Sequence, residues 1–218
     1  MAKRIKEDSS NHLKDPQRRV ILASLKLALE RNWNEVSLGE IAKSANIPLI
    51  EVRKLFHSKN AILKALNQQM DTEVLANAAT VSSNGTIRDQ LFELLMLRFD
   101  ALTREKEAIT RIICCTISRD PIASFIGLKN SKASMRIIME AAGISTKTPL
   151  GQLKVNGLLA VYMNTICTWL KDDTPDLTKT MADLDKGLAR AEAFLYSLPF
   201  KNFKMDTSKL NKKRRNNV

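Results

Sequence analysis

The side chains of this sequence that could act on a partner are mostly cations. The chain has 218 residues, with 35 Lys and Arg against 23 Asp and Glu, which gives a formal net charge of +12. Its two histidines, His12 and His57, are not paired with a Ser or Cys nucleophile, and the Asp residues between 172 and 185 surround a helix junction that explains them. We therefore expect a protein that binds a polyanion, is not an enzyme and has no catalytic residues.

The spacing of the residues indicates neither a metal site nor a nucleotide site. The cysteines Cys114, Cys115 and Cys167 lack the CxxC spacing of zinc and redox sites, and the histidines have no other ligand cluster near them. Neither GxGxxG nor GxxxxGK[ST] occurs, and the longest apolar run is too short to span a bilayer. We predict no metal and no cofactor. The odd cysteine count and a start without a secretory signal favour a reducing cytoplasm.

The positive charge is concentrated at the two ends of the chain. Residues 1–60 contain 12 Lys and Arg against 7 acids, and residues 199–218 contain 7 against 1. Residues 61–198 contain 16 against 15 and are nearly neutral. A solvated surface would spread its excess evenly, so the segregation favours nucleic acid or acidic lipid as partner. The arm with Lys3, Arg4 and Lys6 could reach a minor groove, whereas the tail could equally be a flexible, solubilising segment.

The hydrophobic pattern predicts an all-α protein of about nine helices. Pro16 can open a first helix that ends near Arg31, and the residues on its apolar face are Ile21, Leu22, Leu25, Ala28 and Leu29. Later helices are expected from Thr86, over 105–118, 121–142 and 150–170, and from Pro175 to Leu198. We predict an N-terminal domain over 1–80, a second helical domain over 86–198, and a basic tail over 199–218. Residues 81–85 are the expected boundary.

Two short helices joined by a tight turn are predicted between residues 37 and 56. Ser37 and Glu40 form a capping-box pattern, Asn46 suits the left-handed residue that ends a helix, and Pro48 suits the first position of the next helix. We expect a buried side that fixes the angle between the helices and consists of Ile41, Ile47, Val52 and Phe56. The outward residues are then Leu49, Ile50, Arg53 and Lys54. This is the spacing of a helix-turn-helix, whose second helix enters the major groove.

The segment from Arg18 to Leu66 resembles the DNA-binding domain of the TetR family of one-component repressors. The matching residues are Ser37, Ile41, Ala42, Ala45, Ile47, Phe56, Ser58, Lys59 and Leu63. The resemblance implies that residues 1–80 contain a helix-turn-helix that binds double-stranded DNA at a palindromic operator. It also implies that residues 86–198 form a helical effector and dimerisation domain. The candidate DNA contacts are Arg18, Ser37, Lys43, Pro48, Leu49, Ile50, Arg53, Lys54 and Lys59.

The second helix departs from the family pattern. Asn46 replaces the turn Gly, larger residues occupy positions 49–51, and Arg53 stands where the family commonly has Tyr. Glu51 would repel the DNA backbone unless it accepts from a cytosine amino group, whereas Arg53 and Lys54 favour phosphate or guanine contacts. A helix-turn-helix retained only as a folding unit is the alternative.

The last two long helices suit a homodimer. Their apolar faces consist of Val155, Leu158, Leu159, Tyr162, Met163 and Ile166 on the first and Leu177, Met181, Leu184, Leu188, Ala191 and Leu195 on the second. Two copies could form a four-helix interface and set two reading helices roughly 34–36 Å apart. The same residues could equally fill the core of a monomer.

A small apolar effector would need a pocket in this half of the chain. The candidate pocket residues are Phe92, Phe99, Phe125, Met135, Met139 and Trp169, with Ile113 beside them. At helical spacing such a set could also be plain core.

Residues 165–192 resemble the closing helices of the ubiquinone-biosynthesis lipid-binding family, which has a TetR-like fold. The matching residues are Trp169, Leu170, Asp172, Asp173, Thr174, Asp176, Thr180, Leu184 and Asp185. Physically, the pattern predicts a helix stop and a restart in which Thr174 caps the next helix and Pro175 is its first residue. A structural corner explains it equally well.

Two main hypotheses therefore remain. One is a cytoplasmic, homodimeric repressor that responds to a small apolar effector. The other is a lipid- or isoprenoid-binding accessory protein of quinone biosynthesis that meets a membrane surface and has a vestigial helix-turn-helix. A regulator without a ligand is a third possibility.

Overall fold

The computed structural model describes residues 15–78 and 85–197, which form nine α-helices and contain no strand. The all-α prediction is confirmed. The basic arm, the tail and most of the expected boundary at 81–85 lie outside the described residues. No helix within the two described ranges has the length and apolar character needed to cross a membrane. The helices are α2 (Pro16–Glu30), α3 (Leu38–Ala45), α4 (Leu49–Leu55), α5 (Lys59–Asn77), α6 (Ile87–Thr103), α7 (Lys106–Arg119), α8 (Pro121–Ala141), α9 (Pro149–Trp169) and α10 (Thr178–Ser197).

Side-chain caps determine where most of these helices begin. The Asp15 carboxylate accepts from the Gln17 amide at 2.9 Å, directly before Pro16 at the first helical position. Thr86 caps α6 as expected, in a reciprocal capping box with Asp89. Because caps satisfy the free amides of the first turn, these polar residues specify the helix starts that the sequence pattern indicated.

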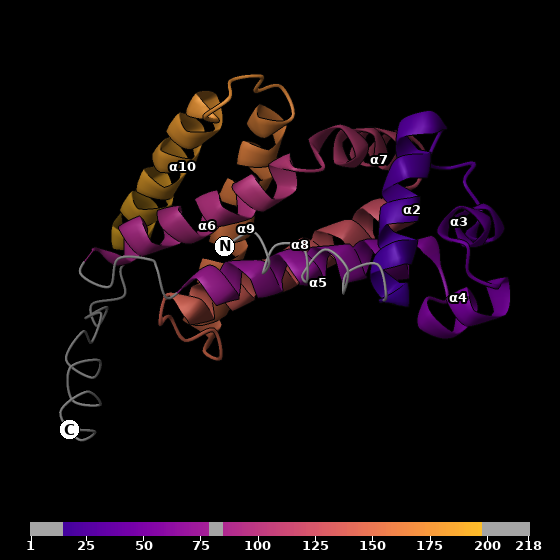
Figure 1. Cartoon of the computed structure of the whole chain (residues 1–218). Helices are drawn as coiled ribbons and strands as arrows, with labels where there is room; N and C mark the ends of the chain where they lie inside the picture. Colours follow the sequence, from indigo (N-terminus) through magenta and orange to yellow (C-terminus); the bar gives the residue numbers. More distant parts are fainter. Residues whose placement is uncertain (1–14, 79–84, 198–218) are drawn as a thin grey trace, which may run out of the picture.

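The helices α2, α3 and α4 lie together at one end of the molecule, and α9 and α10 pair at the other (Figure 1). The long helix α5 runs from this head into the body, where it packs against α6 and α8. A second connection is made by α7, which packs against both α2 and α8. The head is therefore joined to the body through α5 and α7.

One continuous apolar core runs through head and body. In the body it is built around three of the expected pocket residues, Phe99, Met135 and Trp169, whose side chains are almost completely buried. Phe99 lies against Trp169 with ring centroids 6.4 Å apart. These residues fill space rather than enclose it.

The burial of several other residues differs from expectation. Phe125 is 68% exposed, because α8 buries its second half, around Met135, and leaves its first half at the surface. Leu22 and Leu29 are also exposed, since the buried face of α2 is centred on Val20, Ser24 and Ala28.

The apolar faces of α9 and α10 mostly form the core of one chain. Val155, Leu158 and Tyr162 are buried, as are Leu184 and Leu188 on α10. The alternative of a monomer core therefore accounts for most of the residues expected at a dimer interface. Of the expected interface residues, Met181 is exposed. Other exposed apolar side chains of these helices, such as Phe194 and Tyr196, are described below.

The corner before α10 differs from the expected restart. The helix begins at Thr178 rather than at Pro175, because Leu177 has φ +53° and interrupts the helical path. Thr174 is still part of the cap, since its hydroxyl accepts from the Thr178 amide at 3.0 Å.

A buried carboxylate holds this corner together. Asp172 accepts four hydrogen bonds, two from the amide and hydroxyl of Thr174 and two from the amide and hydroxyl of Thr180. Desolvation raises the pKa of Asp172, but these hydrogen bonds outweigh it and hold the pKa well below its ordinary value. The Asp-Thr motif of the C-terminal resemblance thus has a structural role here.

We expect Asp172→Asn to lower the free energy of unfolding at pH 7 by about 2–4 kcal/mol, because the amide has only one oxygen for four donors. The pKa of Asp172 is lowered in the folded state, so its contribution is complete above the ordinary value near 3.8 and is lost as the pH falls below it. Urea unfolding of both proteins at several pH values should show a constant difference above pH 5 that narrows below pH 4. Asp173→Asn, at the exposed neighbour, is the control and should change little. An equal effect of both substitutions would contradict the assigned role.

Candidate functional site

The turn between α3 and α4 has the geometry that the sequence predicted. The Ser37 hydroxyl accepts from the Glu40 amide at 3.2 Å, and the Glu40 carboxylate accepts from the Ser37 amide at 2.8 Å. Asn46 is left-handed with φ 52° and ψ 48°, and the Ile47 amide donates to the Ala42 carbonyl at 3.0 Å. These contacts end α3 and redirect the chain within three residues. Pro48 immediately precedes α4 rather than beginning it.

An arginine of α2 fixes this turn from outside the two helices. One nitrogen of the Arg19 guanidinium, Nη2, donates to the carbonyls of Ala45 at 2.6 Å and Asn46 at 2.9 Å. The carbonyls at the end of α3 carry partial negative charge, so a cation is favourable there. Sequence analysis missed this role because 26 residues separate Arg19 from Ala45.

The outward face of α4 combines cations with exposed apolar side chains. Leu49 and Ile50 are 44% and 65% exposed, and Arg53 and Lys54 are also exposed. The buried side of the α3–turn–α4 unit carries the expected residues Ile41, Ile47, Val52 and Phe56. Exposed Lys43 and Pro48 flank this face, and Glu51 is an exposed acid within it. The structure therefore brings together six of the nine candidate DNA contacts, namely Lys43, Pro48, Leu49, Ile50, Arg53 and Lys54.

Lys59 is engaged inside the protein and does not extend from this face. Its Nζ atom donates to the carbonyls of Trp33 at 2.6 Å and Asn34 at 3.2 Å, and lies 4.9 Å from the centre of the Trp33 ring. Partial burial lowers the pKa of Lys59, although Asp120 and Glu40 oppose this shift. The sequence-based assignment of Lys59 as a DNA contact is thus replaced by a role in joining α5 to the head.

The remaining two candidate DNA contacts are Ser37 and Arg18. Ser37 is exposed, but its hydroxyl serves the capping box. Arg18 is half-buried near the start of α2. Neither is held on the outward face of α4.

Two further hydrogen bonds tie the head to α7. The Asn34 side-chain amide donates to the Cys115 carbonyl at 3.1 Å, and the Arg111 guanidinium donates to the Leu29 carbonyl at 2.5 Å. Together with Lys59, they connect the segment from Leu29 to Asn34 to both helices that enter the body. A shift of α5 or α7 would therefore move the head.

A cavity of about 270 Å³ lies between α5, α6, α7, α8 and α9, and it opens to solvent beside exposed Ile117 and Leu128. Its apolar walls come mainly from Leu63, Leu66 and Met70 of α5 and from Ile109, Ile112 and Ile113 of α7. The expected neighbour Ile113 is part of this wall. None of the six candidate pocket residues lines this cavity, because the expectation centred on the core of α6, α8 and α9.

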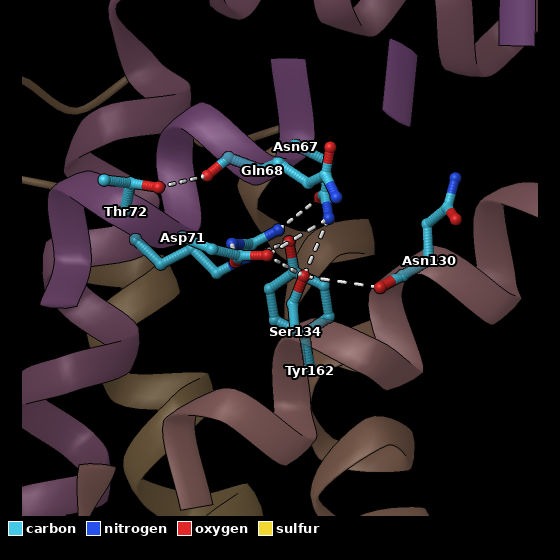
Figure 2. A network of polar contacts seen from close by, with 8 residues as sticks. Asn67, Gln68, Asp71, Thr72, Asn130, Ser134 and Tyr162 are labelled. Atoms are coloured by element: carbon cyan, nitrogen blue, oxygen red, sulfur yellow. Dashed lines mark hydrogen bonds and ion pairs between the residues drawn. The ribbon is translucent and has the colours of Figure 1, made fainter. Parts of the chain in front are cut away.

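Beside the cavity lies a buried polar network that sequence analysis also missed (Figure 2). The guanidinium of Arg98 pairs with Asp71 and Asn67 of α5 and donates to the Tyr162 hydroxyl at 3.1 Å. The Ser134 hydroxyl donates to Asp71 at 2.8 Å. Desolvation lowers the pKa of Arg98, but its interactions with Tyr162 and Asp71 outweigh this and raise it overall. The network joins α5, α6, α8 and α9 as a neutral, hydrogen-bonded unit.

Comparison with solved structures gives extensive matches at low sequence identity. A TetR transcriptional regulator from Nitrosomonas europaea ATCC 19718 matches with a TM-score of 0.65 and 20% identity over 82% of this chain and 99% of that chain. One from Rhodococcus sp. RHA1 matches with a TM-score of 0.61 and 21% identity over 87% and 97% of the two chains.

A tetR-family regulator from Streptomyces coelicolor has a TM-score of 0.54 and 17% identity over 90% and 89%. The chain has the TetR fold. No protein-family model and no curated protein matches the sequence. In this TetR fold, α2–α4 form the helix-turn-helix head and α5–α10 form the body.

We expect Lys59→Ala to lower the free energy of unfolding by about 1–3 kcal/mol, because two hydrogen bonds from a charged donor and a cation–π contact are lost. Chemical denaturation measures the effect. Lys64→Ala, at an exposed position of the same helix, provides the control and should change stability by less than about 0.5 kcal/mol. Equal stability of the two variants would contradict the joining role of Lys59.

Proposed function

We propose that this protein is a DNA-binding transcriptional regulator that acts as a homodimer and represses until a small, largely apolar molecule binds. The observation that carries the proposal is the outward face of α4, where Arg53 and Lys54 are exposed on a helix fixed by a rigid turn. A helix presented in this way can enter the major groove and read base edges.

The residues of this face suit both kinds of DNA contact. Lys43 and Lys54 can neutralise phosphates, and Arg53 can reach phosphate or donate two hydrogen bonds to guanine. Exposed Leu49 and Ile50 offer apolar surface for thymine methyl groups. Glu51 requires a cytosine amino group, since a carboxylate is repelled by phosphates.

Dimerisation is proposed through the exposed side of α9 and α10. An apolar groove of about 440 Å³ lies there, and Phe194 and Tyr196 of α10 are 58% and 65% exposed beside it. Charged Arg88, Arg190 and Glu192 also line it. An apolar centre with charged residues around it is the usual composition of a protein interface.

The effector is proposed to bind in the cavity of about 270 Å³ that is lined by the five helices α5 to α9. Both α5 and α7 line the cavity and both hold the head, so a ligand that fits one arrangement of these helices better would shift the orientation of α4. The ligand must bind the two states unequally for this to regulate DNA binding.

A lipid-binding accessory protein on the same fold is the second candidate. Exposed Ile117, Ile122 and Phe125 around the turn between α7 and α8 favour it, because they provide apolar surface next to the cavity. This candidate predicts copurifying lipid and no selective DNA binding.

We expect Arg53→Ala to weaken binding to a palindromic site from the upstream region of the gene by roughly tenfold or more, since a lost base contact costs about 1–3 kcal/mol. Fluorescence anisotropy over a series of salt concentrations measures both affinity and salt slope. Lys179→Ala removes an exposed cation at the opposite end and should leave the affinity unchanged. Binding by the parent protein that is flat with salt and shows no preference for the palindrome would refute the regulator.

We expect Phe194→Asp to convert the dimer to a monomer, because a carboxylate would be buried without a partner at the interface. Sedimentation velocity measures the oligomeric state. The matched control is Phe125→Asp, since Phe125 is similarly exposed but lies on α8. A dimer that survives Phe194→Asp, or dissociates with Phe125→Asp, would place the interface elsewhere.

A further inference from the structure

The walls of the cavity lined by the five helices α5 to α9 carry no charged side chain. All of the residues that line it are apolar or neutral polar, and its polar lining includes Asn67, Asn130, Ser131 and Tyr162. The groove of α9 and α10 differs, since Arg88, Lys154, Arg190 and Glu192 line it. A charged group held against these walls would find no partner of opposite charge, so the cavity favours a neutral ligand.

The polar side of the cavity offers a hydrogen-bond donor. The Tyr162 oxygen accepts from Nε of Arg98 at 3.1 Å, and no acceptor for its own proton is found among the described residues. A hydroxyl that accepts from a cation becomes a stronger donor, because hydrogen bonds in a chain polarise one another. Tyr162 also lines the cavity, so its hydroxyl is a candidate donor for an acceptor bound there.

The Arg98 guanidinium behind Tyr162 is not available to neutralise an anion. It already pairs with Asp71, and the Asp71 carboxylate also accepts from Ser134 and Asn67. All four side chains are inside the protein, with Arg98 and Ser134 completely buried. An anionic ligand would have to displace Asp71 from a satisfied pair, which leaves a buried carboxylate without its partner.

We propose that the cavity binds an uncharged, mainly apolar small molecule with one hydrogen-bond acceptor, such as a carbonyl, and that Tyr162 donates to this acceptor. The volume of about 270 Å³ is near the lower limit of ligand pockets, so the molecule is small. This inference rests on the proposed effector site and specifies the class of its ligand.

The first test compares ligands of one chain length with different head groups. The purified, full-length protein is loaded with N-phenyl-1-naphthylamine, a neutral fluorescent probe, and titrated with 2-octanone, octanoate or octylammonium at pH 7. We expect the ketone to displace the probe at concentrations at least tenfold lower than either ion. Displacement by octanoate or octylammonium at the same concentration as the ketone would overturn the proposal, as would failure of the ketone to displace the probe.

The second test separates Tyr162 from general effects on the fold. Tyr162→Phe should weaken 2-octanone binding roughly tenfold, the value of one hydrogen bond of about 1.4 kcal/mol, and leave octane binding unchanged. Tyr196→Phe changes the exposed tyrosine of α10 and should have no effect. Equal ketone affinity of the parent and Tyr162→Phe would refute the donor role.

Substitutions at two glycines test whether the ligand binds in the cavity or in the groove, even if the Tyr162→Phe variant fails to fold. Gly127 lines the cavity and Gly157 lines the groove of α9 and α10, and a Cβ at either would meet no atom within 4 Å. We expect Gly127→Leu to reduce ketone and probe binding at least tenfold, whereas Gly157→Leu should retain both. The reverse result would place the ligand in the groove and overturn the proposal.

These binding assays contain no DNA, so their outcome is separate from that of the regulator. Ketone binding with the expected charge selectivity, but without palindrome binding, would support the ligand class and refute the regulator. Palindrome binding together with equal affinity for all three head groups would support the regulator and refute the proposed ligand class.

Discussion

The position of α5 in the body depends on the buried pair between Asp71 and Arg98. Asp71 lies near the middle of α5 and Arg98 on α6, and separating them would leave a buried charge on each side, at a cost of about 3–5 kcal/mol. Such a pair adds little stability compared with an apolar core, but it favours one rotation and one register of α5. Because α5 begins at Lys59, which is bonded to the head, this constraint also sets where α4 points.

The local elements of the head could be predicted from the sequence, because their determinants lie within a few residues of one another. The capping box at Ser37, the left-handed Asn46 and the inward side chains of Val52 and Phe56 all followed from spacing. The same holds for most helix boundaries in the body. The start of α10 was wrong by three residues, because Leu177 has a positive φ, which leucine rarely adopts, beside the hydrogen bonds of Asp172.

The contacts between distant segments could not be predicted. Arg98 interrupts the apolar run of α6, which indicates a special position, but its partner Asp71 lies 27 residues earlier and Tyr162 lies 64 residues later. Lys59 matched a family pattern of DNA contacts, yet the carbonyls of Trp33 and Asn34 bind it. For the same reason, apolar periodicity identified Phe99 and Trp169 as buried without indicating whether they fill the core or line a cavity.

The two hollows of the body reach different parts of the molecule. The uncharged cavity is bordered by α5 and α7, the two helices that hold the head, so a molecule bound there would contact the supports of α4. The groove with charged residues is bordered by α6, α9, α10 and the end of α8, and no residue of α2–α5 or α7 lines it. Under the proposed function, the groove would set the distance between two heads, whereas the cavity would set the orientation of each. A neutral ligand suits this arrangement, because it can shift α5 without breaking the ion pair that keeps the helix in register.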